Sequence, residues 1–293
     1  MSIDVLSEVL EALGLEGTLE EEGPLAPAMI GEGLNPNGEP KPGERRFVFV
    51  LEGEGLLELS ASGDVFDARP GDFLLFTPGE PLCIREGGIR VLKGRFRFRT
   101  PFEHPFVRRL PRFLWWSEGA RSGAPAAPRE LLSRIKSEWQ ATRPGGRLVL
   151  ERLLPVLFVD LLRSLGAIPE GPKGGFPAPL RDRILAQALA ALHEEPAAAW
   201  TIEALARRAA VSRSGLGERF RRGLGVAPMS YLTHWRMTLA RRLLEGSELP
   251  IGRVAERVGY GSEAAFSRAF RRIEGTTPGR VRRAAARPGL HRP

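Results

Sequence analysis

The C-terminal part of the chain contains one pattern twice, and this repeat restricts the possible folds more than any other feature of the sequence. The first part of each copy recurs at a spacing of 49 residues, where Ile202, Leu205-Ala206 and Val211 match Ile251, Val254-Ala255 and Tyr260. The second part recurs at 50 residues, where Ser212, Phe220-Arg221-Arg222, Gly225 and Pro228 match Ser262, Phe270-Arg271-Arg272, Gly275 and Pro278. A duplication of this length predicts two similar supersecondary units.

Each copy predicts a short amphipathic helix, a tight turn and a second helix that carries basic residues. A serine N-cap, Ser212 or Ser262, would accept a bond from an unpaired amide and fix the start of the second helix. Gly259 suits a sharp exit from a helix, and Gly225 and Gly275 suit helix ends. The pattern predicts two helix-turn-helix units joined by one long helix over residues 229–245. Such a helix would hold the units at a fixed separation, suited to major-groove faces about 34 Å apart.

Several motifs occur in the order and at the spacing of a known family. They are Trp200-Thr201-Ile202-Glu203-Ala204-Leu205-Ala206, Pro228-Met229-Ser230-Tyr231-Leu232, Trp235-Arg236-Met237, Val258-Gly259-Tyr260 and Phe266-Ser267-Arg268-Ala269-Phe270-Arg271-Arg272. The segment that contains them resembles the AraC/XylS DNA-binding domain. The resemblance implies a sequence-specific transcriptional regulator that binds double-stranded DNA at an operator or promoter. The alternative is a helical bundle that contains a duplicated hairpin and has no role in DNA binding.

The resemblance places base contacts at seven positions of the two second helices: Ser214, Gly217, Glu218, Glu263, Ala264, Ser267 and Arg268. Arginine can bind a guanine edge and a carboxylate can accept from cytosine N4, whereas Gly217 offers no side chain. Point charges position a protein on the phosphate backbone, so the expected phosphate contacts are Arg213, Arg221, Arg271 and Arg272. Arg236, inside the connecting helix, is expected in a structural ion pair. The expected core residues are Leu205, Leu216, Phe220, Phe266 and Phe270.

Positive charge is concentrated in the same region. From Leu180 to Pro293 there are 21 arginines, no lysine and 10 acidic residues, a formal charge of +11, whereas the rest of the chain carries −3. This asymmetry fits a domain that binds a polyanion, although a genome rich in G and C would also produce many arginines.

The N-terminal half consists of short apolar runs separated by turn residues from Arg45 to Arg99. The runs are Phe47–Leu51, Leu56–Leu59, Phe73–Phe76, Leu82–Ile84 and Ile89–Phe98, with turns predicted at 52–55, 62–64, 69–72, 78–81 and 86–88. Strands about ten residues apart predict a small antiparallel barrel or sandwich. Together with the motifs at 50–54 and 71–76, these strands resemble the cupin-type sensor domain of many such regulators.

Metal-binding cupins place histidines at positions that hold Arg46, Val48 and Pro81-Leu82 here, and no cluster of His, Cys or Glu has ligand spacing. We therefore expect no metal, no cofactor and no catalytic residue, which disfavours a cupin enzyme tethered to DNA. Arg46, Arg95 and Arg97 could hold an acidic effector, or could lie on a solvated sheet face. The single cysteine, Cys83, excludes an intramolecular disulfide, and it fits a buried small hydrophobe better than an oxidation sensor.

The expected fold is α+β and multidomain. Residues 1–110 are expected to form a cupin-like antiparallel β-barrel with helices, and residues 180–293 an all-α domain with two helix-turn-helix units. Between them lie a helical dimerisation segment at 111–168 and a linker rich in Gly and Pro at 169–179. The dimerisation prediction rests on a helix over residues 147–165 that is apolar on most sides, because such a helix is either buried or paired with another chain.

The expected function is that of an effector-responsive regulator, and the third alternative is a regulator whose N-terminal half only dimerises. Besides DNA, the expected partners are a second copy of the chain, RNA polymerase and an unidentified small-molecule effector, with no membrane. The first residues lack the cationic start of a signal peptide, and no apolar stretch reaches the ~20 residues of a membrane span. A cytoplasmic protein is therefore expected.

Overall fold

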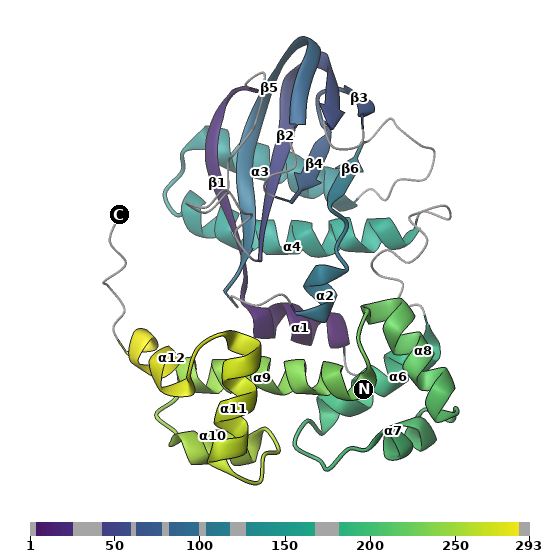
Figure 1. Ribbon diagram of the computed structural model, residues 1–293. Coiled ribbons are helices and arrows are strands. Elements are labelled where there is room, and N and C mark those ends of the chain that lie inside the picture. The colour runs from purple at the N-terminus through teal and green to yellow at the C-terminus, as the bar shows by residue number, and fades with distance from the viewer. Residues whose placement is uncertain are drawn as a thin grey trace. The chain divides into compact units, whose positions relative to one another are not determined.

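Two units, each with its own core, make up the part of the chain that the computed structural model describes (Figure 1). The described residues are 4–25, 43–59, 63–77, 82–99, 104–117, 127–167 and 182–286, so the expected linker at 169–179 lies outside them. The sheet unit takes its described residues from 14–99 and 110–167. The helical unit takes its described residues from 4–13, 104–109 and 182–286.

The sheet unit is built on one antiparallel sheet, as the alternating strand pattern predicts. Its strands are β1 Leu15–Pro24, β2 Glu44–Leu59, β3 Asp64–Ala68, β4 Phe73–Phe76, β5 Leu82–Phe98 and β6 Phe113–Trp116. They run in the order β1-β5-β2-β4-β6, and β3 pairs with β2. Because β6 pairs with β4, the sheet continues beyond the expected boundary at residue 110.

Two of the predicted turns, at 52–55 and 86–88, are wrong. These residues continue β2 and β5, with Gly53 opposite Ile89 and Gly55 opposite Gly87. A Cβ on Gly53 would lie 2.1 Å from the Gly88 carbonyl oxygen, and one on Gly87 would lie 2.3 Å from that of Glu54. The glycines therefore allow two long strands to approach closely and do not reverse the chain.

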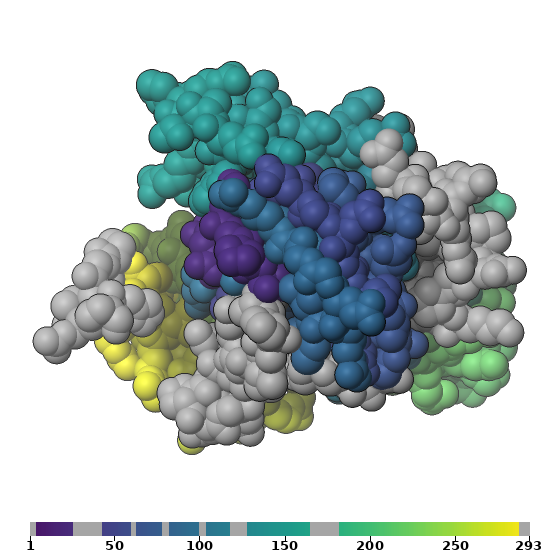
Figure 2. All heavy atoms as spheres, turned by 90° about the horizontal axis from the view of Figure 1, so that it is seen from above, coloured from purple at the N-terminus to yellow at the C-terminus, as the bar shows by residue number. Residues whose placement is uncertain are grey.

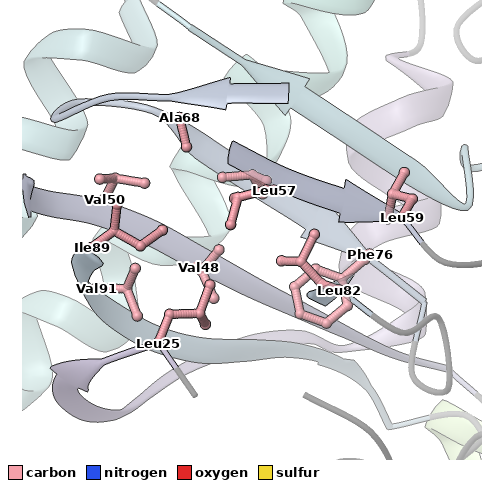
Figure 3. Close-up of a cluster of buried hydrophobic side chains, with 11 residues drawn as sticks. Leu25, Val48, Val50, Leu57, Leu59, Ala68, Phe76, Leu82, Ile89 and Val91 are labelled. Carbon is pink, nitrogen blue, oxygen red and sulfur yellow. The ribbon is translucent and has the colours of Figure 1, made fainter. Parts of the chain in front are cut away.

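An apolar cluster fills one face of the sheet (Figure 3). Leu25 directly follows β1, and the other side chains alternate along the strands. All of them are nearly inaccessible to solvent: Leu25, Val48, Val50, Leu57, Leu59, Ala68, Leu74, Phe76, Leu82, Ile89 and Val91. Cys83, predicted as a buried small hydrophobe, follows Leu82 and is half-buried. The period of two therefore buries one face of β2 in this cluster, and the other face carries Phe47.

Two helices, α3 Ala127–Ala141 and α4 Gly146–Ala167, complete the sheet unit. In Figure 2 they form the teal surface alongside the blue strands. The ring of Phe158 on α4 lies 4.9 Å from that of Phe96 on β5, so part of the apolar surface of α4 packs against the sheet. Leu148 and Val156 of α4 nevertheless remain 58% and 49% exposed.

The helical unit is assembled around α9. Its helices are α1 Val5–Leu13, α2 Pro105–Arg108, α6 Arg183–Glu194, α7 Ile202–Arg208, α8 Arg213–Leu224, α9 Pro228–Gly246, α10 Ile251–Arg257, α11 Glu263–Glu274 and α12 Pro278–Ala285. The long helix predicted over 229–245 is confirmed as α9. None of the helices in the described ranges is long and apolar enough to cross a membrane.

Residues 4–13 and 104–109 were expected in the sensor domain, but they belong to the helical unit. Helix α1 packs on α6 and α9 through an apolar face that includes Val9 and Leu13. The buried ring of Phe106 lies 6.1 Å from that of Tyr231 on α9. These two segments pack their apolar side chains on the helical unit. Their position along the chain, next to the strands, does not reveal this.

Candidate nucleic-acid interface

The two second helices of the repeat, α8 and α11, begin with the same capping geometry. The Ser212 hydroxyl accepts a hydrogen bond from the Gly215 amide at 3.1 Å, and the Ser262 hydroxyl accepts one from the Ala265 amide at 3.2 Å. Both helices also end in a left-handed glycine, Gly225 or Gly275. The predicted serine N-caps and glycine C-caps are therefore confirmed, and they fix both ends of each helix.

The turn before each second helix contains one residue with positive φ, 49 residues apart in the two copies. In the first copy this residue is Ala210, with a φ of 53°, and in the second it is Gly259, with a φ of 80°. The apolar residues expected in the core, Leu205, Leu216, Phe220, Phe266 and Phe270, are all fully buried. Each copy therefore forms the predicted helix-turn-helix.

Arg236 of α9 ties the two copies together. Its guanidinium donates to the carbonyls of Pro196 at 2.7 Å and Ala198 at 2.8 Å, before the first copy, and to that of Gly259 at 3.3 Å, in the second. The side chain also lies over the ring of Tyr260. The expected structural role is thus correct, but the expected ion pair is wrong, because its partners are backbone carbonyls.

Six of the seven positions expected to contact bases are accessible on α8 and α11. Ser214, Glu218, Glu263, Ala264 and Arg268 are exposed, and Ser267 is half-buried. Gly217 differs, because it is buried beneath a side chain of its own helix. Five polar side chains and Ala264 therefore lie accessible on the first turns of both helices, where a base-reading helix carries its contacts.

The four arginines expected to contact phosphate are all exposed. Arg213 is 68% exposed and pairs with Glu203 of α7 at 2.9 Å. Arg221, Arg271 and Arg272 form no ion pair with any described residue. Three of the four guanidinium groups are therefore free to meet an anion.

Two supports of α8 were missed by sequence reasoning. Arg109 donates to the carbonyls of Arg221 at 2.9 Å and Arg222 at 3.2 Å, which satisfies the last turn of α8. Asp182, the N-cap of α6, pairs with Arg219 of α8 at 2.6 Å. Neither contact had a signal in the sequence, because each joins segments that are distant along the chain.

A chain of polar contacts, buried at His193 and Tyr231, joins α1 to the connecting helix α9. His193 of α6 contacts the Glu8 carboxylate through Nδ1 at 2.8 Å and the Tyr231 hydroxyl through Nε2 at 2.7 Å, and its ring stacks on Trp235 at 3.9 Å. Burial lowers the pKa of His193 to about 3. The neutral imidazole can therefore donate to Glu8 while it accepts from Tyr231.

The second copy contains a buried acid instead. Glu274 of α11 accepts two hydrogen bonds from Arg241 of α9, at 2.8 and 2.5 Å. Its second oxygen is buried and has no hydrogen-bond partner among the described residues. Burial raises the pKa of Glu274 to about 7, although Arg241 opposes this shift. Arg241 therefore holds α11 on the connecting helix through a carboxyl that resists ionisation.

The arginines expected to hold an acidic effector lie on β2 and β5. Arg46 pairs with Glu20 at 2.7 Å and Glu44 at 3.2 Å, and Arg95 pairs with the same Glu20 at 3.0 Å. Arg97 is exposed on β5. Among the described residues, no three His, Cys, Asp or Glu side chains lie close enough together to hold a metal ion.

Both halves of the chain match known families. Residues 4–167 match the family described as Cupin, and residues 205–284 match the family described as Helix-turn-helix domain. An AraC-like transcription regulator from Streptomyces antibioticus is 37% identical over 265 residues, which cover 81% of this chain and 86% of that protein. The chain belongs to the AraC-like transcription regulators. The predicted fold class, a cupin-like sheet with helices followed by a double helix-turn-helix, is thereby confirmed.

Further transcription regulators are similar over most of the chain or over the helical part. The RCS-specific transcriptional activator RclR of Escherichia coli is 28% identical over 291 residues, which cover 96% of this chain and 97% of that protein. The DNA-binding domain of AdpA in complex with a target DNA is 38% identical, with a TM-score of 0.34, over 36% of this chain and 96% of that domain. The helix-turn-helix match and the membership of the AraC-like transcription regulators make the chain a DNA-binding transcription regulator.

Proposed function

We propose that α8 and α11 enter successive major grooves of an operator and read its sequence. The proposed base contacts are the six accessible positions Ser214, Glu218, Glu263, Ala264, Ser267 and Arg268, and Arg271 and Arg272 are proposed to contact phosphate. One observation carries the proposal: both helices start at equivalent serine caps, so equivalent positions of the two copies present their side chains on the first turns. A recognition helix reads base edges with these turns.

The test is to select preferred sites from random duplex DNA with the whole chain, and to measure binding from 50 to 200 mM salt. The two proposed phosphate contacts would weaken binding about tenfold over this range, because each releases condensed counterions. A sequence preference together with this salt dependence supports the proposal. Equal binding to all duplexes, or binding that does not change with salt, would contradict it.

The matched variants are Arg268→Ala and Arg271→Ala. Loss of Arg268 should flatten the preference at one base pair, because a bidentate contact with guanine distinguishes bases by roughly 1–3 kcal/mol. Loss of Arg271 should weaken all sequences about equally and lower the salt slope by roughly one unit. If both variants lose affinity uniformly, the assignment of Arg268 to base reading is wrong.

We further propose that the sheet unit responds to a small-molecule effector and that the chain has no enzymatic activity. Since Arg46 and Arg95 already share Glu20, an acidic effector at these arginines would compete with that carboxylate. Glu20→Gln should therefore strengthen the response of operator affinity to such a molecule. An operator affinity that no candidate effector changes would favour a regulator whose N-terminal half only dimerises. We also propose that the chain holds no metal, and equimolar iron, zinc or manganese retained after chelation would contradict this.

We also propose that the regulator forms a homodimer through α4. Leu148 and Val156 are separated by eight residues, so they lie on the same side of this helix, and both are exposed. Leu148→Glu combined with Val156→Glu should give monomers by light scattering at micromolar concentration, whereas Val65→Glu, at an exposed residue of β3, should not. A monomeric unaltered chain would refute the proposal.

A further inference from the structure

The side chain of Arg221 lies over Gly217, one turn earlier on α8. Apart from the helix's own backbone, the three heavy atoms nearest to the place of a Gly217 Cβ all belong to the Arg221 guanidinium, at 3.8 to 4.0 Å. Side chains of a helix point toward its N-terminus, so a residue covers the turn that precedes its own Cα. The Arg221 guanidinium therefore covers the position that a longer side chain at residue 217 would fill.

No described carboxylate holds Arg221 away from this position. Its guanidinium is exposed and unpaired, whereas Arg222 next to it is drawn toward Asp182 at 3.6 Å. Arg221 is thus presented to a ligand with its donors available. A planar guanidinium can bind both acceptors of a guanine edge at once.

The second copy shows what the same position does with a side chain present. Ser267 and Arg271 of α11 match Gly217 and Arg221 at the spacing of 50 residues. Ser267 is half-exposed, so the second copy presents its own polar group where the first presents a covered glycine. The two arginines, alike in sequence, therefore differ in what lies one turn before them.

We propose that Arg221 reads a base, in place of the side chain that Gly217 lacks, and that Arg271 remains a phosphate contact. The contact is a bidentate pair with a guanine in the half of the operator read by α8. This inference rests on the proposed function, since it assigns one residue of that interface. It also moves Arg221 from the phosphate contacts, where the sequence placed it, to the base contacts.

The first experiment compares Arg221→Lys with Arg271→Lys in the whole chain, on all single-base variants of the selected operator at two salt concentrations. Lysine keeps the charge but loses the bidentate fork. Arg221→Lys should reduce the preference for guanine at one base pair about tenfold and leave the salt slope unchanged. Arg271→Lys should preserve every base preference. If the unaltered chain prefers certain sequences and Arg221→Lys keeps the same guanine preference, this inference alone is refuted. If the unaltered chain has no sequence preference, the proposed function itself is refuted.

The second experiment changes the space that Arg221 occupies. A Cβ at residue 217 would meet the guanidinium at an ordinary contact distance, so Gly217→Ala should keep the guanine preference. Gly217→Gln would occupy that space and should remove the preference at the same base pair that Arg221→Lys affects. A Gly217→Gln protein that unfolds at the temperature of Gly217→Ala and still prefers guanine there would overturn the inference.

Discussion

The two helix-turn-helix copies reach nearly the same geometry with different residues at the points of greatest constraint. At the turn, the first copy places Ala210 at a φ of 53°, whereas the second places Gly259 at 80°. A Cβ on Gly259 would lie 2.6 Å from the Ala197 carbonyl oxygen and 2.7 Å from a nitrogen of Arg236. The second turn is therefore packed against the arginine that joins the copies, and only the second copy depends on glycine here.

The start of the second helix differs as well. Arg213 opens α8, where the helix dipole disfavours a cation, and Glu203 of α7 pairs with it. The equivalent position of α11 holds Glu263, an anion that the dipole favours, and the equivalent of Glu203 is Gly252. The first copy thus compensates an unfavourable charge that the second copy does not have.

The largest expected effect tests the difference between the two turns. Gly259→Ala should lower the free energy of unfolding by about 3–5 kcal/mol, because a left-handed alanine is strained and its Cβ clashes with backbone. Ala210→Gly should change it by less than about 1 kcal/mol, since relief of strain offsets the added freedom of the unfolded chain. Urea denaturation of both variants checks this. Equal effects at the two turns would show that their packing does not differ as described.

A second prediction concerns the buried acid of the second copy. The folded pKa of Glu274, about 7, is above its ordinary value of 4.5, so the folded chain binds this proton more tightly. Its stability contribution is full below about pH 4.5 and is lost as pH rises to about 7, roughly 3 kcal/mol in total. Glu274→Gln, which keeps an acceptor for Arg241, should remove this dependence. Glu256→Gln, at an exposed surface pair, should not. Identical pH profiles for the unaltered chain and Glu274→Gln would contradict the prediction.

The histidine beside the first copy should respond to pH in the opposite direction. The folded pKa of His193, about 3, is below its ordinary value of 6.5, so its contribution is full above about pH 6.5 and falls as the solution becomes more acidic. At pH 5 the loss is about 2 kcal/mol. The buried His104 has its pKa lowered too, and Glu8, Tyr231 and Trp235 are the other side chains around His193.

The measurement is the free energy of unfolding at pH 7 and pH 5 for the unaltered chain, His193→Gln and Tyr231→Phe. His193→Gln should lose part of the acid sensitivity. Tyr231→Phe removes a hydrogen bond without removing the titrating group, so it should be less stable at both pH values and keep the same slope. A steeper slope in His193→Gln than in the unaltered chain would show that this histidine is not held neutral.

The sequence predicted those parts of the interface that depend on short-range rules. Serine caps, glycine ends and the buried face of each helix follow from contacts within a few residues, and all were confirmed. It did not predict that Arg109 would cap α8 or that α1 would join the helical unit, because neither contact leaves a periodic signal. The strand β1 was missed for a related reason: its acidic residues have low strand propensity, but Glu21 pairs with Lys93 of the neighbouring strand at 2.6 Å.

The smallest expected effect on folding tests the charge difference between the copies. Glu203→Gln removes the partner of Arg213, and the unfolding temperature should hardly change, because exposed ion pairs contribute little. DNA binding should change more. If the pair restrains Arg213, its release should strengthen binding and raise the salt slope by up to roughly one unit. Combining Arg213→Ala with Glu203→Gln should then remove this increase in the salt slope. A gain in affinity that persists in the double variant would instead reflect only the lost negative charge, and Arg213 would have no place among the phosphate contacts.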